Sequence, residues 1–215
     1  MKISSSFLQI VLALTVLMGL AKPDPDPLQD YCVADTKSSL YLNGAPCLSP
    51  TLASSSNFTT SALAEPGDTK ANQFGFGVTL TTLANLPGMN TMARVDIAGN
   101  GLVPPHSHPR ASVVTICLQG VILVGFVDTS NRLLTQRLKP GDSFVFPRGL
   151  IHFLYNTDPR KPASAVSGLS SRNPGAQIAS RAAFVSSPPI PDVVLEKAFQ
   201  ISPQDVAKIR RNLGA

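Results

Sequence analysis

Short apolar segments that favour β-strands recur about every ten residues along the central part of this 215-residue sequence. No helical period separates them, and turn residues such as Pro140-Gly141 stand between neighbouring segments. Gln119-Gly120 separates two of them and predicts a hairpin. Strands at this spacing predict an all-β antiparallel sandwich or barrel. The expected strands are residues 74–80, 92–97, 113–118, 121–127, 133–138, 143–146, 151–155 and 163–169.

The first 21 residues have the layout of a secretory signal peptide. Lys2 precedes an apolar run at residues 7–20, and Gly19 and Ala21 provide the small residues that signal peptidase accepts. The run is shorter than the roughly 20 residues that cross a bilayer, and a polar Pro-Asp stretch follows it. We therefore predict cleavage after Ala21, an extracellular mature protein and no membrane span after cleavage.

The charge pattern argues against a nucleic-acid partner. The formal net charge is +5, but the basic residues form only short, separate groups at residues 160–161 and 208–211. Such groups are typical of a solvated surface.

The C-terminus changes character from strands to helices. Residues 191–199 form one predicted helix, and Ser202-Pro203 then provides an N-cap with proline at the first helical position. Val206, Ile209 and Leu213 follow on one face of a second helix. We expect these two helices to dock on a neighbouring subunit, because little core remains for them to cover.

The three cysteines suggest one disulfide and one free thiol. In a secreted protein, a Cys32–Cys47 disulfide would close a loop of about fifteen residues and stabilise the fold by ~3 kcal/mol. Cys117 lies within an apolar run, which predicts a buried free thiol. Asn57 begins an Asn-Phe-Thr sequon and is a predicted glycosylation site.

These features divide the chain into four predicted segments. They are a signal peptide at residues 1–21, a disulfide-bearing extension at 22–70, a β-barrel at 71–190 and a helical oligomerisation segment at 191–215.

The three histidines of the chain all occupy positions that suit a metal ligand. His106 and His108 are two residues apart, so on a strand both side chains leave from the same face. His152 begins another predicted strand, which a barrel could bring against the first. A His-x-His pair alone is a weak signal, since ordinary core or surface histidines show it too. Three histidines and water are nevertheless an accepted catalytic metal set.

Several motifs resemble those of the plant germins and germin-like proteins of the cupin superfamily. Residues 101–112 (GLVPPHSHPRAS) are similar to the first cupin box, and residues 140–153 (PGDSFVFPRGLIHF) to the second. Residues 29–35 resemble the N-terminal box, whose cysteine pairs in the family with the one found here as Cys47. Residues 171–175 and 188–190 resemble further family landmarks.

The resemblance implies a jelly-roll cupin barrel and an extracellular, N-glycosylated, manganese-binding protein. It also implies dimers clasped by C-terminal helices and assembled into hexamers as trimers of dimers. Some members of the family oxidise oxalate, some dismutate superoxide, and many have no known reaction.

This chain departs from the family at the fourth metal ligand. Germins have a glutamate five residues after the second histidine, where this chain has Val113. Mn²⁺ favours carboxylate oxygen, whereas three imidazoles suit Zn, Cu, Ni or Fe about as well or better. Thr115 and Cys117 share the strand face of Val113, but threonine is a poor ligand and Cys117 lies ~13 Å along the strand. Asp96 and Asp142 cannot be placed from the sequence, and water is the expected fourth ligand.

The expected function is that of a secreted apoplastic germin-like protein that holds manganese weakly, or another divalent ion, and acts in plant defence or development. Val103 stands where oxalate-oxidising germins have an asparagine, which argues against oxalate oxidation. The sequence does not decide whether the protein has residual superoxide dismutase-type activity. The alternative is a non-catalytic oligomeric protein that binds cell-wall components and has lost tight metal binding.

Overall fold

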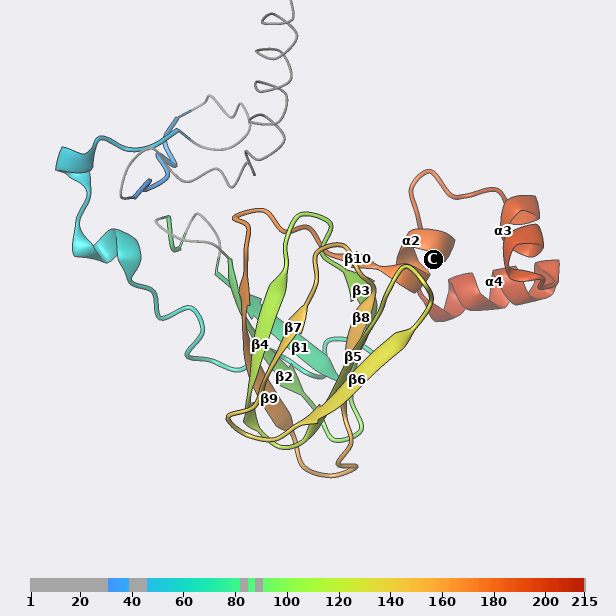
Figure 1. Ribbon diagram of the computed structural model, residues 1–215. Coiled ribbons are helices and arrows are strands. Elements are labelled where there is room, and N and C mark those ends of the chain that lie inside the picture. The colour runs from blue at the N-terminus through green and yellow to red at the C-terminus, as the bar shows by residue number, and fades with distance from the viewer. Residues whose placement is uncertain (1–30, 39–45, 82–84, 88–90, 215) are drawn as a thin grey trace, which may run out of the picture. The chain divides into compact units, whose positions relative to one another are not determined.

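A computed structural model describes residues 31–38, 46–81, 85–87 and 91–214, and shows two five-stranded antiparallel sheets that face each other (Figure 1). The predicted signal peptide and the Pro-Asp leader lie outside the described residues. One sheet contains, in order, β1 (Phe76–Leu80), β2 (Met92–Ile97), β9 (Ala163–Leu169), β4 (Val113–Gln119) and β7 (Ser143–Phe146). The other contains β10 (Gln177–Ile178), β3 (Leu102–Ser107), β8 (His152–Asn156), β5 (Ile122–Val127) and β6 (Leu133–Leu138).

Alternation of side chains along the strands builds a single core between the sheets. In β9 every second residue is buried, and β4 buries Val113, Thr115 and Cys117 while the residues between them are exposed. Branched and aromatic side chains from both sheets meet in this core, which removes apolar surface from water. The all-β prediction is confirmed, as is the shared face of Val113, Thr115 and Cys117.

The predicted hairpin at Gln119-Gly120 is wrong. β4 pairs with β7 and β9, whereas β5 pairs with β6 and β8, so the link between them carries the chain from one sheet to the other. Gly120 has a φ of +80°, and a Cβ there would lie 2.7 Å from the Cβ of Ala163. A tight glycine turn is therefore needed to close this end of the barrel, and apolar pattern alone cannot distinguish that from a hairpin.

The segment before β1 contains two short 3-10 helices, η1 (Pro50–Leu52) and η2 (Ser55–Phe58). Asp96 on β2 accepts a hydrogen bond from the Gly67 amide at 2.8 Å and forms a 3.0 Å ion pair with Arg94. Arg94 also donates to the carbonyls of Leu63 and Ala64. These contacts attach residues 63–67 to the sheet.

The cysteines are in the states that the sequence suggests. Cys32 and Cys47 are disulfide-bonded, and Cys117 is a buried free thiol whose pKa is raised by burial. None of the helices among the described residues is long and apolar enough to span a membrane. The proposed segment boundaries at residues 21, 70 and 190 stay predictions.

Three helices follow the barrel: α2 (Ala179–Phe184), α3 (Asp192–Phe199) and α4 (Pro203–Asn212). The two predicted helices are confirmed, and Ser202 caps α4 by accepting a hydrogen bond from the Asp205 amide. α2 was not expected, because six residues show too little periodicity. The buried side chains of Phe184, Leu195 and Val206 form a second, smaller core shared by the three helices.

Two leucines of β6 allow the contribution of the barrel core to be measured. Leu138 is 1% exposed and Leu133 is 54% exposed. We expect Leu138→Ala to lower the free energy of unfolding by about 2–5 kcal/mol, because it leaves a cavity. Leu133→Ala should change it by no more than about 0.5 kcal/mol. Urea denaturation of both variants checks this, and equal losses would contradict the assignment of the core.

Candidate metal centre

The pairing of β3 with β8 brings two of the three histidines together. His106 lies directly opposite His152 in the register, and Ile178 of β10 flanks His106 on its other side. His108 follows the last residue of β3. The register shifts between Val103 and His106, where two prolines without amide hydrogens interrupt the ladder. The prolines thus lie inside β3.

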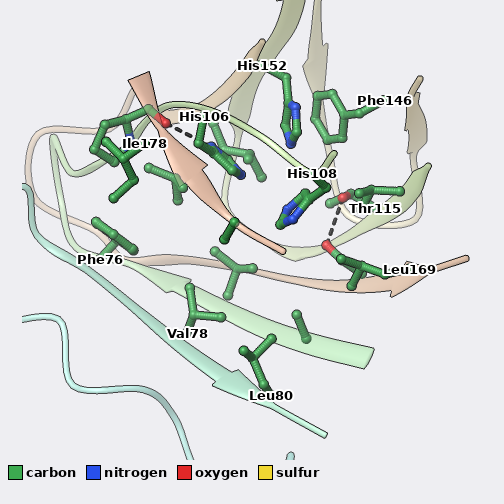
Figure 2. A pocket seen from close by; sticks show the side chains of 18 residues that line it. Phe76, Val78, Leu80, His106, His108, Thr115, Phe146, His152, Leu169 and Ile178 are labelled. Atoms are coloured by element: carbon green, nitrogen blue, oxygen red, sulfur yellow. Dashed lines mark hydrogen bonds between the residues drawn. The ribbon is translucent and has the colours of Figure 1, made fainter. Parts of the chain in front are cut away.

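The three imidazole rings lie close together, tilted or edge-on to one another (Figure 2). The ring centroids of His106 and His152 are 4.2 Å apart, and that of His108 lies 5.1 and 5.4 Å from them. One ring nitrogen from each histidine lies within 4.8 Å of the other two, so the group could hold a metal ion.

Backbone carbonyls determine which ring nitrogen of each histidine is free. The Nδ1 atoms of His106 and His152 lie 2.8 and 2.9 Å from the carbonyl oxygens of Pro104 and Leu150. The Nδ1 atom of His108 lies 2.5 Å from the carbonyl oxygen of Gly175. A carbonyl oxygen can only accept, so each Nδ1 carries the proton and each Nε2 keeps its lone pair. These carbonyls orient the rings as outer partners do in metal sites, and the residues fit a divalent ion.

Arg110 binds the loop just before Gly175. The Arg110 Nε atom donates to the Asn173 carbonyl at 2.6 Å, and its Nη2 atom donates to the Asn173 side chain at 2.9 Å. Gly175 has a φ of +66°, and a Cβ there would lie 2.9 Å from Arg110 Nη2. Sequence reasoning did not assign these residues to the site, although residues 171–175 were among the family landmarks.

Burial keeps the imidazoles of His106 and His152 neutral. Desolvation lowers the pKa of His106 to about 4 and that of His152 to about 3, and in His152 the neighbouring His106 adds to the effect. The ring of Phe146 stacks on His152 with centroids 4.4 Å apart (Figure 2). Neutral imidazole is the form that binds metals, so these two rings are ready to bind at pH values well below 7.

No carboxylate joins the three histidines among the described residues. Val113 is buried and lines the same cavity as the three rings, together with Val103. The Thr115 hydroxyl is 2.8 Å from the Ser167 hydroxyl and bonds to it. The Cys117 sulfur lies near the carbonyls of Gln119 and Gly120 and does not line the cavity.

The two aspartates that the sequence could not place are occupied elsewhere. Asp96 binds the Gly67 amide and Arg94, as described above. Asp142 accepts a hydrogen bond from the Lys139 amide in the turn before β7. Neither contributes to the group of histidines.

The depressed histidine pKa values predict a pH-dependent stability of the metal-free protein. Between the unfolded pKa of 6.5 and the folded values of about 4 and 3, the unfolded state binds more protons, so stability falls as pH falls. Each histidine should contribute a slope of up to about 1.4 kcal/mol per pH unit between pH 6.5 and 5. Urea denaturation across this range measures the slope, and His152→Leu should make it shallower. An unchanged slope in that variant would contradict the assignment.

Comparisons with known proteins agree with this architecture. The family model described as "Cupin" matches residues 61–207. The chain is 60% identical over 213 residues to "Germin-like protein subfamily 1 member 1" of Arabidopsis thaliana, covering 96% of this chain and 98% of that protein. It is 49% identical over 216 residues to "Germin-like protein 3-1" of Oryza sativa subsp. japonica, covering 96% of each.

A solved structure of oxalate oxidase in complex with the substrate analogue glycolate superposes with a TM-score of 0.82. That protein is 36% identical in sequence, and the match covers 89% of this chain and 98% of the other. The expected cupin fold is therefore confirmed, and this chain belongs to the plant germin-like proteins of the cupin family.

Proposed function

We propose that this chain is a germin-like metalloprotein in which His106, His108 and His152 hold one divalent ion, with water as the expected fourth ligand. The observation that carries the proposal is the convergence of three imidazoles whose Nδ1 atoms are all bonded to backbone carbonyls. That arrangement leaves the Nε2 lone pairs of three neighbouring histidines free to bind an ion. Three histidines and water form an accepted set for a catalytic metal.

The proposed ion is manganese, held weakly, with zinc, copper, nickel or iron as competitors. Neutral imidazoles supply no negative charge, and Val113 leaves the site without the carboxylate oxygen that a hard cation prefers. A bound ion would supply Lewis acidity toward a water ligand or, for a redox metal, electron exchange. The protein's own residues hold the rings in one tautomer and surround them with apolar side chains.

Oxalate oxidation is not part of the proposal, although the compared structure is an oxalate oxidase. Val103 and Val113 both line the cavity, and burying a dianion against apolar side chains is costly. Residual superoxide dismutase-type activity stays an open question that the assays below address.

We also propose that the protein is secreted to the apoplast, with a role in plant defence or development. The N-terminal pattern at residues 1–21 and the disulfide support secretion. Asn57 lies in η2, where its side-chain oxygen accepts a hydrogen bond from the Ser54 amide. This use of the oxygen leaves the amide nitrogen as the proposed point of glycan attachment.

Exposed apolar side chains support a homo-oligomeric state, proposed as a hexamer built from three dimers. Val114, Ile116 and Leu118 of β4 and Val145 of β7 are exposed on the outer face of one sheet. Val193, Val194 and Phe199 are exposed on α3. Contiguous exposed apolar surface of this kind marks interaction sites. If the missing carboxylate has removed tight metal binding, these exposed apolar surfaces favour the alternative, a non-catalytic oligomeric wall protein.

Metal analysis of the secreted protein, purified without added metal, tests the proposal. We expect close to one divalent ion per subunit, and a loss of that ion in His152→Ala, which removes a ligand. Superoxide and oxalate assays on the same sample separate a catalytic from a non-catalytic centre. A wild-type content below about one-tenth of an ion per subunit would favour the alternative, since a working site retains its metal.

Adding the missing carboxylate should strengthen manganese binding. Val113→Glu places an anionic oxygen donor in the cavity beside the histidines, and we expect manganese affinity to rise by about tenfold or more. Leu133→Glu is the matched control, because Leu133 is 54% exposed on β6 and does not line the cavity. Manganese titration followed by electron paramagnetic resonance compares the variants. An equal gain in both would show that the added charge acts at long range.

A further inference from the structure

An apolar cavity of about 220 Å³ opens beside the three histidines (Figure 2). It lies between the two sheets, and strands from both contribute to its wall. None of the described residues that line it is an aspartate, glutamate, lysine or arginine. The lining residues are Phe76, Val78, Leu80, Ala93, Val95, Val103, Pro104, His106, His108, Val113, Thr115, Phe146, His152, Leu154, Ser167, Leu169, Ala176 and Ile178.

The polar side chains of this lining are largely occupied. The hydroxyls of Thr115 and Ser167 bond to each other at 2.8 Å. The Nδ1 atoms of the three histidines are bonded to carbonyl oxygens. The side-chain groups that remain to receive a ligand are one O–H hydrogen of the Thr115–Ser167 hydroxyl pair and the three Nε2 atoms, or the ion that they hold. The cavity therefore has one polar end and an otherwise apolar wall.

The dimensions suit a small organic molecule. An engineered apolar cavity of about 150 Å³ stays dry and binds benzene, so about 220 Å³ accommodates roughly nine non-hydrogen atoms. Val78 and Leu80 line the cavity and are 42% and 46% exposed, which places its mouth at the edge strand β1. Figure 2 shows these two side chains on the side of the cavity away from His152.

We propose that this cavity binds a small neutral organic molecule with a single oxygen donor, such as an alcohol. Its oxygen faces the Nε2 atoms of the histidines, and its apolar body extends toward Val78 and Leu80. The inference deepens the proposed metal-binding function and rests on it for the role of the ion. An O–H group can donate to a free Nε2 atom, and its oxygen lone pair can face a bound cation.

The same lining discriminates against anions. A carboxylate that enters the metal-free cavity meets valine, leucine and phenylalanine side chains and no cationic side chain. An unpaired buried charge is far more costly than a hydroxyl that finds a partner. The occupant should therefore be selected by neutrality as well as by size.

The test compares benzyl alcohol with benzoate, which share a ring but differ in charge. Saturation-transfer NMR on the full-length secreted protein measures both affinities, first after removal of metal and then after loading with zinc. In the metal-free protein we expect benzyl alcohol to bind at least about tenfold more tightly than benzoate, a ratio that corresponds to 1.4 kcal/mol.

Two variants assign the binding to the cavity. Val95→Phe fills it from the buried face of β2, and Val78→Phe narrows its exposed mouth. Each should weaken benzyl alcohol binding by about tenfold or more, since the volume available for the ring is lost. Leu133→Phe, at an exposed position of β6 outside the cavity lining, is the matched control and should leave binding unchanged. If Val95→Phe fails to fold, Val78→Phe is sufficient for the test. The side chain of residue 78 is partly in solvent, so a larger residue there should not prevent folding.

The outcomes separate this inference from the proposed function. Absence of benzyl alcohol binding at about 10 mM, a concentration that would reveal even a weak millimolar complex, would overturn the inference. Equal binding of benzoate in the metal-free protein would do the same, as would unchanged binding in Val78→Phe. If the wild type binds benzyl alcohol but its zinc content stays below one-tenth per subunit, the ligand cavity stands and the metal proposal alone fails.

Discussion

The antiparallel pairing of β3 with β8 is the constraint on which the rest of the site depends. It places His106 opposite His152, and each ring then bonds to a carbonyl of its own chain two residues earlier. Local backbone geometry thus selects the tautomer of two histidines without help from any other side chain. Only His108 needs a distant partner, the carbonyl of Gly175. The barrel therefore orders its three imidazoles mainly through backbone contacts, which tolerate much side-chain change around them.

Such tolerance is compatible with a valine at position 113, where the resemblance to germins implies a carboxylate, beside three rings that still lie close together. Val113 occupies a buried inward position on β4, and its neighbours across the ladder are Phe146 and Leu169. The valine side chain packs against these apolar neighbours. A carboxylate at the same position would need a cation or hydrogen-bond donors as partners. The electrostatic consequence is a site without anionic side chains and within apolar walls, where manganese lacks the carboxylate oxygen that it prefers and a dicarboxylate lacks a cationic side chain to pair with.

Much of this arrangement could be predicted from the sequence because it depends on local periodicity. Alternation along residues 113–118 predicted the common face of Val113, Thr115 and Cys117, and the Ser202 cap marked the start of α4. Features set by long-range contacts could not be predicted. The role of Gly175 depends on a loop 67 residues away from His108, and the stacking of Phe146 on His152 depends on how two sheets meet. The passage of the chain from one sheet to the other at Gly120 could not be predicted for the same reason, since both sheets accept strands of the same apolar pattern.

The loop that holds His108 continues through β10 and α2 to the helices at the C-terminus. Arg110 reaches into it at Asn173, and α2 contacts both β3 and β10. The third imidazole is thus oriented by the same piece of backbone that leads to the proposed oligomerisation segment. If the proposed metal site and the proposed assembly both require this segment to be ordered, metal affinity and subunit assembly are thermodynamically linked, and linkage is reciprocal. In that case, free energy that assembly contributes to ordering this loop also increases the affinity for the ion. A dissociated subunit at low protein concentration should then bind the ion more weakly than the assembled protein.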